Sequence, residues 1–523
     1  MNDKSFRRGL PRCRQVWHFG APVTGAILLL LSFCLPFALA QETRGKELLW
    51  GSDAEGGAPY IFKDPNNPER NIGFEVDLVD ALSRELNRPI RFQQYDFKNL
   101  VPGLKRGDFD FAMDGLEVTP DRQEQVRFSR PYYVYKLQLV TRVQENRFQT
   151  LKGCQKLAGM VVGTMEDTAA ERLLDQLKIS KKIYDGPVEA YQDLSLGRID
   201  AVLLDLPIAI YYAKGDPKLK FVGQPTGKGY YAIAFTKENE ALATQVDAAL
   251  GRLMQTGELR RIYRRWHLWN DNQEELMPAG VFEENEEHEE EQGNILEESR
   301  QKWTLTRYLP LLAEYALVTI RLSALSFCLA IAIGLPVALL RLYGPSPLSW
   351  LATTYVEFFR GIPVLLLLVF LYFGLADLGQ YYRIPLGMTS FQAALLGLGL
   401  NYAAYEAEIY RAGIQSIPVG QWEAAASLGM SRPLTFRRII LPQAVRTILP
   451  PMTSDFVALF KDTSVASAIA LVELTKQYQI LSKSSMKYLE VGLVTAALYL
   501  IMSVPLGHLS RYLEKRLHKS VGA

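Results

Sequence analysis

The chain has 523 residues, a formal net charge of +2 and an apolar share of 48%. This length predicts more than one domain, and the near-neutral charge argues against a nucleic-acid partner. Apolar residues are concentrated in 310–510, whereas 41–300 is mixed and charged. Cys154 stands alone in this mixed part, so no internal disulfide is predicted there. The five histidines are scattered, and no metal site is predicted.

Residues 1–40 are typical of a secretory signal peptide. Four arginines between positions 7 and 14 precede the apolar segment VTGAILLLLSFCLPFALA, and Ala38 and Ala40 fit the small-residue rule for cleavage. Cleavage is preferred to an uncleaved anchor helix, because Pro36 and the small residues end the apolar run abruptly. In both cases the four arginines are predicted to keep the start of the chain inside and to send residue 41 onward across the membrane.

The stretch 41–270 alternates strand-like runs with helical patterns. ELLWGSDA, FDFAMDGL, GMVVGTM and DAVLLDLP are strand-like, whereas GFEVDLVDALSRELN and TAAERLLDQL have apolar residues at helical spacing. The alternation predicts an α/β fold with parallel strands, long enough for two lobes. The following segment, 271–303, contains EENEEHEEEQGNILEE and is predicted to be an acidic, extended linker.

From residue 304 to 523 we expect an all-α transmembrane domain of about five helices, because apolar runs of about 20 residues can cross a bilayer. The predicted spans lie near 313–341, 350–376, 388–409, 444–470 and 488–508. Five spans that begin outside end inside, and the basic segment RYLEKRLHK agrees with a cytoplasmic C-terminus. In the third span, Glu408 and Arg411 are spaced to pair over one helical turn. Glu406, in the same span, is expected to line a path through the membrane that favours cations.

The charged loop EAAASLGMSRPLTFRRIILPQA, which falls on the inner side by this count, resembles the EAA loop of ABC importer permeases. The neighbouring EFFRGIPVLLLL and LFKDTSVAS are similar to the polar amino-acid permease family. The resemblance implies that the loop docks onto a separate ABC ATPase subunit. The residues that carry the match are Glu423, Ala424, Ala425, Gly429, Leu441 and Pro442.

No GxxxxGK[ST] motif occurs in the chain, so ATP is expected on the partner ATPase and no cofactor in this chain. Importers of this kind need two membrane domains, and one chain carries one. A homodimer with twofold symmetry is therefore expected.

The segments GFEVDLVDAL, FDFAMDGLEVTPDR, VRFSRPYYVY and RIDAVLLDLPIAIYY resemble the periplasmic amino-acid-binding proteins of the family 3 type. The resemblance implies a two-lobed α/β clamp with crossing strands near 133–142 and 227–236. Lobe one would comprise 45–132 plus 237–270, and lobe two 143–226. The chain is thus expected to join a binding domain, 41–270, to its own permease. It would lie in a bacterial inner membrane with the clamp in the periplasm.

The resemblance also implies how the clamp holds an amino acid. Arg122 matches the carboxylate-binding arginine, whose planar fork suits a carboxylate. Thr119 and the backbone of Gly115 are placed to assist it. Thr168 lies where the family has a turn at a helix N-terminus, which favours an anion, although Asp167 replaces the family's glycine.

Asp205 matches the ammonium-binding aspartate. An aspartate in this place can also cap the following helix, and the two roles can coexist. Asp53 and Phe97 match positions that hold the substrate side chain, with a core aromatic as the alternative for Phe97. Glu117 replaces the family's threonine, so it must point elsewhere, pair with a cation, or contact a cationic part of the ligand. Together with Asp53 it makes the pocket acidic, which favours a cationic or amide amino acid over an acidic one.

Three other functions fit the sequence less well. A glutamate-receptor-like ligand-gated channel is the alternative, but such channels place the pore within the clamp and carry a filter resembling TVGYG, and neither occurs in this chain. A sensor would need a signalling domain, for which the tail after residue 508 is too short. An enzyme is the least favoured of these functions, because the sequence shows no pairing of a nucleophile with a general base.

Overall fold

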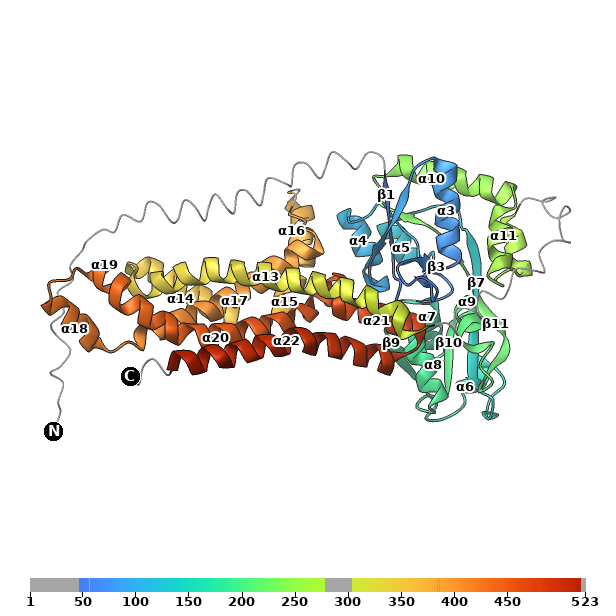
Figure 1. Ribbon diagram of the computed structural model, residues 1–523. Coiled ribbons are helices and arrows are strands. Elements are labelled where there is room, and N and C mark those ends of the chain that lie inside the picture. The colour runs from blue at the N-terminus through green and yellow to red at the C-terminus, as the bar shows by residue number, and fades with distance from the viewer. Residues whose placement is uncertain (1–46, 56, 278–302, 383, 385, 519–523) are drawn as a thin grey trace, which may run out of the picture. The chain divides into compact units, whose positions relative to one another are not determined.

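The computed structural model describes residues 47–55, 57–277, 303–382, 384 and 386–518. The described residues from Leu48 onward belong to one compact unit. The predicted signal peptide and most of the predicted linker lie outside the described residues. The described part has an α/β N-terminal portion and a helical C-terminal portion (Figure 1).

The first sheet has the strand order β4-β1-β5-β12-β6. Strands β4, β1 and β5 run parallel, as the alternating pattern predicts, whereas β12 runs antiparallel to its neighbours. Helix α3 packs against α10 and α11 on this sheet (Figure 1). The elements are β1 Leu48–Ser52, α3 Phe74–Leu86, β4 Ile90–Gln94, η1 Phe97–Asn99, α4 Leu100–Arg106, β5 Phe111–Ala112, α5 Pro120–Gln125, β6 Arg127–Phe128, β12 Ala234–Phe235, α10 Glu240–Gln255 and α11 Glu258–Arg265, with a hairpin of β2 Phe62–Lys63 and β3 Asn71–Ile72.

The second sheet has the order β11-β7-β10-β8-β9. Strands β7 and β11 pair antiparallel from Tyr133↔Tyr231 to Arg142↔Leu219, and β8, β9 and β10 run parallel. The first predicted crossing, 133–142, coincides with β7, and the second, 227–236, covers the end of β11 and all of β12. The elements are β7 Tyr133–Arg142, α6 Leu151–Cys154, β8 Val162–Met165, α7 Ala169–Gln176, β9 Lys181–Tyr184, α8 Pro187–Ser195, β10 Ala201–Asp205, α9 Leu206–Ala213 and β11 Leu219–Tyr231.

The segment directly after α11 packs against the α/β portion, whereas a purely solvated linker would not. The 3₁₀ helix η2 (Asp271–Leu276) packs on β7, where the buried amide of Gln273 accepts the N–H of Val134 at 2.9 Å and donates to its carbonyl at 2.8 Å. Residues 271–277, which the sequence analysis assigns to the linker, therefore pack as part of the α/β portion.

The C-terminal portion is helical throughout its described residues. Helix α13 packs along α17, and α20 packs along α22. Its elements are α13 Leu305–Tyr343, α14 Ser346–Gly361, α15 Val364–Val369, the π-helix η3 Phe370–Gly374, α16 Leu375–Tyr382, α17 Ser390–Gln415, α18 Val419–Ser427, α19 Arg432–Thr435, the π-helix η4 Phe436–Ile440, α20 Leu441–Asp462, η5 Thr463–Ile469, α21 Leu474–Ser485 and α22 Tyr488–His518.

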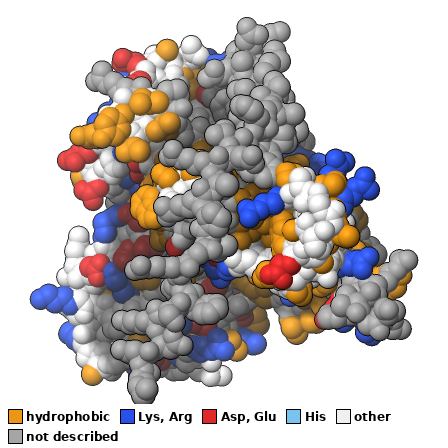
Figure 2. Space-filling model, turned by 90° about the vertical axis from the view of Figure 1, so that its left-hand side faces the viewer, with side chains coloured by type: hydrophobic (Ala, Val, Ile, Leu, Met, Phe, Trp, Pro, Cys, Tyr) orange, Lys and Arg blue, Asp and Glu red, His pale blue; other side chains and the backbone are white. Residues whose placement is uncertain are grey.

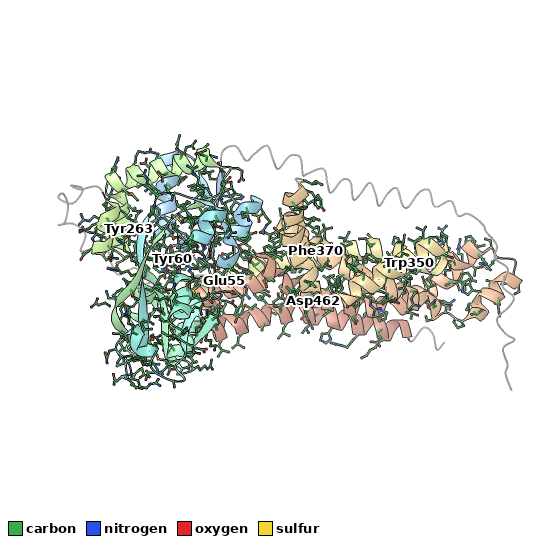
Figure 3. The ribbon with its side chains drawn as sticks, turned by 180° about the vertical axis from the view of Figure 1, so that it is seen from behind. Glu55, Tyr60, Tyr263, Trp350, Phe370 and Asp462 are labelled. Atoms are coloured by element: carbon green, nitrogen blue, oxygen red, sulfur yellow. The ribbon has the colours of Figure 1, made fainter. Side chains whose placement is uncertain are left out.

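Two of these helices, α13 and the Tyr488–Tyr512 part of α22, are long and apolar enough to cross a membrane. The pair Ser346–Gly361 and Val364–Gly379 adds a third span if its bend of 103° is counted within one span. Large apolar side chains such as Trp350 and Phe370 lie exposed on this portion (Figure 3), as expected for a lipid-facing surface. The predicted span 388–409 falls on α17, and the predicted span 444–470 falls on α20 and η5.

Within the helical portion, Glu408 is held by several arginines. Arg411 donates to its carboxylate at 2.7 Å, which confirms the predicted pair, and Arg341 of α13 also donates to it. This cluster joins α13 to α17 through charge-assisted hydrogen bonds.

The start of α3 yields a first prediction. Gly73 has φ = 150°, and a Cβ there would lie 1.9 Å from the carbonyl oxygen of Tyr60. Gly107 also has positive φ, 77°, but a Cβ there meets nothing within 4 Å. We expect Gly107→Ala to lower the free energy of unfolding by roughly 1–2 kcal/mol, the cost of the left-handed conformation. Gly73→Ala should cost roughly 3 kcal/mol or more, since the Tyr60 backbone must move.

Urea unfolding of the full chain in detergent, followed by tryptophan fluorescence, measures both variants against the wild type. Equal losses at the two positions would contradict the steric explanation for Gly73.

Candidate functional site

Arg122 lies between loops that extend from the two sheets. Its guanidinium donates to the carbonyl of Glu117 at 3.2 Å, and to the carbonyl and carboxylate of Asp167 at 3.0 and 2.9 Å. The Phe97 ring centroid lies 5.6 Å from its guanidinium carbon. Thr119 caps α5 by accepting the N–H of Arg122 at 3.3 Å. These partners hold the fork at the junction of the two α/β halves.

Glu117 pairs with cations, which is one of the three alternatives open to it. Its carboxylate accepts from Arg172 at 2.7 Å and lies 3.6 Å from Arg122. It also accepts the N–H of Ala169 at 2.8 Å. Burial raises the pKa of Glu117, and the guanidinium of Arg122 opposes that rise. Sequence reasoning missed Arg172, which follows Thr168 by one helical turn.

The turn before α7 keeps the conformation for which glycine is suited. Asp167 has φ = 56°, in the left-handed region that aspartate tolerates better than most residues. Thr168 caps α7 by accepting the N–H of Glu171 at 3.2 Å. The N-terminus of α7 holds the Glu117 carboxylate in this structure, at the place that the resemblance assigns to a ligand anion.

Asp205 ends β10 and accepts a hydrogen bond from Tyr231. It makes no side-chain hydrogen bond to the first turn of α9, so capping is not its role in this structure. The hydroxyl of Tyr231 also lies 2.8 Å from that of Tyr60. Burial raises the pKa of Asp205, and the charge of Glu117 raises it further. The contact between Tyr60 and Tyr231 connects the loop after β1 to β11. Neither tyrosine was identified from the sequence.

Asp53 organises two loops at the end of β1. Its carboxylate accepts the N–H of Glu55 at 2.9 Å, the N–H of Phe97 at 2.9 Å and the amide of Gln94 at 2.9 Å. Burial raises its pKa to about 6, and the charges of Glu55 and Asp96 add to the rise. Phe97 faces both Arg122 and the cavity described below.

Gly115 uses its backbone N–H within the protein. It donates to the carboxylate of Glu75 at 2.7 Å, and Tyr132 donates to the same oxygen. A Cβ at Gly115 would lie 2.9 Å from the Tyr60 ring, and its φ is 58°. Gly115 therefore allows the loop to pass close to Tyr60, which explains a glycine here.

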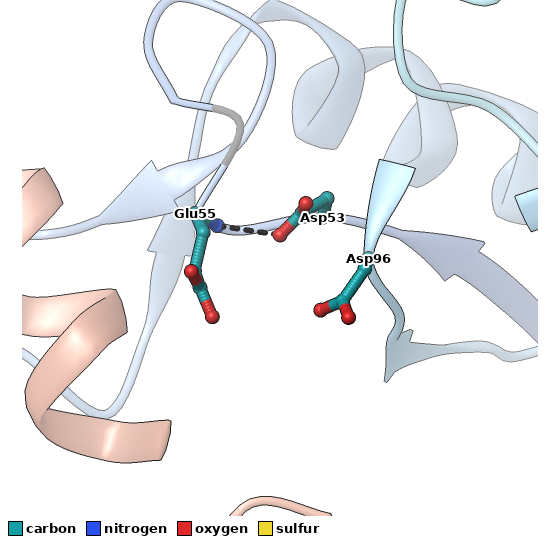
Figure 4. A group of neighbouring side chains, drawn as sticks. All are labelled: Asp53, Glu55 and Asp96. Atoms are coloured by element: carbon teal, nitrogen blue, oxygen red, sulfur yellow. Dashed lines mark hydrogen bonds between the residues drawn. The ribbon is translucent and has the colours of Figure 1, made fainter. Parts of the chain in front are cut away.

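A cluster of three carboxylates, those of Asp53, Glu55 and Asp96, forms the acidic part of the site (Figure 4). One oxygen from each lies within 4.8 Å of the others. Among the described residues, Lys476 and Lys483 of α21 supply the opposing charge. The cluster borders a cavity of about 270 Å³, which Phe97, Met165 and Tyr184 also line. Sequence reasoning identified Asp53 but not the other four charged residues.

The residues of the EAA resemblance lie on exposed elements. Glu423 and Ala424 are exposed on α18, Ala425 is buried, and Gly429 follows the helix with φ = 73°. The N–H of Met430 donates to the carbonyl of Ala425 at 3.0 Å, which closes the turn. Leu428 is 79% exposed, an apolar side chain without cover. Two further matched residues, Leu441 and Pro442, begin α20 and are exposed.

Comparison with known proteins identifies two families in the chain. Residues 49–268 match bacterial extracellular solute-binding proteins, family 3. Residues 330–519 match the binding-protein-dependent transport system inner membrane component. The second match sets aside the ligand-gated channel as an alternative.

Two curated relatives cover the helical part. A probable glutamine ABC transporter permease of Bacillus subtilis, GlnM, is 38% identical over 202 residues, which is 39% of this chain and 91% of the relative. An L-cystine transport system permease of Bacillus subtilis, TcyB, is 35% identical over 222 residues, 42% of this chain and 92% of the relative.

Two solved structures resemble the α/β part. An ancestral arginine-binding protein bound to glutamine has 29% identity and a TM-score of 0.40, covering 43% of this chain and 99% of its own. A Salmonella typhimurium periplasmic binding protein with high arginine specificity has 29% identity and a TM-score of 0.39, covering 42% and 99%.

The Glu75 carboxyl that holds the Gly115 loop yields a prediction on pH. Burial raises its pKa from 4.5 to about 7, so the folded chain binds this proton more tightly than the unfolded chain. The resulting stability is fully present below pH 4.5 and is lost as the pH rises through about 7. Glu75→Gln keeps an acceptor for Gly115 without the titration. Between pH 5 and 8 we expect the free energy of unfolding of the wild type to fall by an amount on the order of 2 kcal/mol through this group, and that of the variant to lack this fall.

Thermal unfolding of both proteins at pH 5, 6, 7 and 8 measures the difference. A variant whose melting temperature falls with pH as steeply as that of the wild type would show that Glu75 is not the titrating group.

Proposed function

The chain belongs to the inner membrane components of binding-protein-dependent transport systems, and we propose that it imports a cationic or amide amino acid. It is an amino-acid ABC transporter in which a family 3 solute-binding domain precedes the permease domain. The observation that carries the substrate proposal is the charge of the cavity. Asp53, Glu55 and Asp96 present carboxylates there, which attract a cationic side chain and repel an acidic one.

We assign the two backbone charges of the ligand to the residues of the resemblance. The α-carboxylate would contact Arg122 and the first turn of α7 after Thr168, and the α-ammonium would contact Asp205. Glu117 now holds the Ala169 N–H, so an incoming carboxylate has to take over that donor. Glu117 would retain Arg172, which pairs with it at 2.7 Å. Thr119 supports this arrangement by capping α5 with its side chain, and Gly115 supports it by letting its loop pass close to Tyr60.

The energy for uptake is proposed to come from a separate ABC ATPase. The exposed α18, with Glu423 and Leu428 at its surface, presents both charge and apolar area to such a partner. Figure 2 views the molecule from the end that carries α18 and α19, where Lys and Arg side chains lie beside hydrophobic ones.

The chain is an inner membrane protein. We further propose a homodimer with its binding domains in the periplasm and its C-termini in the cytoplasm.

Substitution of Arg122 tests the carboxylate assignment. Arg122→Lys keeps the charge but loses the bidentate fork, so L-arginine and L-glutamine should bind at least about tenfold more weakly. Arg127→Lys, on the exposed pair with Glu240, is the matched control and should bind as the wild type does. Calorimetry on the full chain in nanodiscs measures both. Undiminished affinity in the Arg122 variant would exclude this residue from the carboxylate site.

Substitution in α18 tests the coupling assignment. Glu423→Lys or Gly429→Asp should abolish ATPase association and uptake while leaving amino-acid binding unchanged. Glu514→Lys, an exposed reversal on α22, is the control and should retain both. ATPase co-purification, vesicle uptake and calorimetry report the three properties. Loss of amino-acid binding together with uptake would mean that the loop serves folding instead of coupling.

A further inference from the structure

Helix α21 of the permease part contacts both halves of the α/β part. Ser484 accepts the N–H of Lys63, next to the first sheet, at 3.3 Å. Just beyond α21, Tyr488 donates to Glu189 of α8, next to the second sheet, at 3.0 Å. The helix contributes Lys476, Gln479 and Lys483 to the lining of the cavity.

Two lysines of α21 lie inside the carboxylate cluster. Lys476 Nζ is 2.5 Å from Glu55 and 2.5 Å from Asp96, and Lys483 Nζ is 2.8 Å from the other oxygen of Glu55. The side chains of Lys476 and Glu55 are only 5% and 8% exposed. Each ammonium lies where a cationic group of a ligand would meet the same carboxylates.

The electrostatics tie these groups to one another. Burial alone would lower the pKa of Lys476, but Glu55 and Asp96 outweigh it and raise that pKa above its ordinary value. Burial alone would raise the pKa of Glu55, but Lys476 and Lys483 outweigh it and lower that pKa. Charges buried this far from water are costly to leave unpaired. The carboxylates therefore require a cation, whether it comes from α21 or from a ligand.

We propose that Lys476 and Lys483 are tethered competitors for the cation subsite of the clamp. When α21 is seated they hold Glu55 and Asp96, and they thereby drive a basic amino-acid side chain out of the clamp toward the permease. The inference rests on the proposed function, and it narrows the substrate class to amino acids with a cationic side chain. An uncharged amide side chain does not compete for these carboxylates, so its binding is nearly independent of the two lysines.

The test compares L-arginine and L-glutamine on the full chain in nanodiscs without ATPase. The double variant Lys476→Met, Lys483→Met should bind arginine about tenfold more tightly than the wild type, and glutamine within about twofold. Lys476→Arg keeps a competing cation and should bind as the wild type does. Lys487→Met is the control, since Lys487 pairs with Glu490 outside the cavity. An equal change for both ligands, or no change, would overturn the inference and leave the proposed function standing.

A second measurement needs no variant, so it holds even if removal of the lysines destabilises the fold. Coupling between ligand and lysines is reciprocal, so saturating arginine should free Lys476 and Lys483. Amine acylation followed by mass spectrometry should then show both lysines labelled several-fold faster with arginine and unchanged with glutamine. Labelling that is unaffected by bound arginine overturns the inference. Absence of binding by any basic or amide amino acid would overturn the proposed function, and the inference with it.

Discussion

A buried guanidinium cannot give up its charge, and this constraint shapes the centre of the α/β part. Arg122 is nearly inaccessible to solvent, so acceptors must surround it at all times. Glu117 and Asp167 supply them from the two halves of the domain. Glu117 is a buried carboxylate and needs donors in turn. It accepts hydrogen bonds from the N-terminus of α7 and from Arg172. With Glu117 in this position, the charges of the site are balanced from within the protein.

The features that sequence reasoning found are those that local chemistry determines. Thr119 and Thr168, which the resemblance assigns to the ligand site, cap the helices that begin directly after them. The parallel strands and the Glu408–Arg411 pair likewise follow from short-range patterns. A family resemblance located Arg122 and Asp205, whose roles as ligand contacts remain predictions.

The features that sequence reasoning missed depend on pairing between distant segments. Lys476 and Asp96 are 380 residues apart, and no periodicity connects them. The Tyr231 hydroxyl reaches Tyr60 across 171 residues. The segment 271–277 looked like the start of an acidic linker, because the pairing of Gln273 with Val134 has no signature in composition. Such contacts come from tertiary packing, which overrides local tendency.

The two ends of the site obey one rule. Glu117 occupies the donors assigned to a ligand carboxylate, and Lys476 occupies the acceptors assigned to a ligand cation. Under the proposed assignments, binding is an exchange of partners, in which the ligand carboxylate replaces Glu117 and the ligand cation replaces Lys476. The free energy gained is the difference between two well-paired states, so it is smaller than the contacts alone suggest. Under the proposed assignments, a clamp built this way favours ligands that carry both charges. It releases them when Lys476 returns to Glu55 and Asp96, because these buried carboxylates then regain a cation.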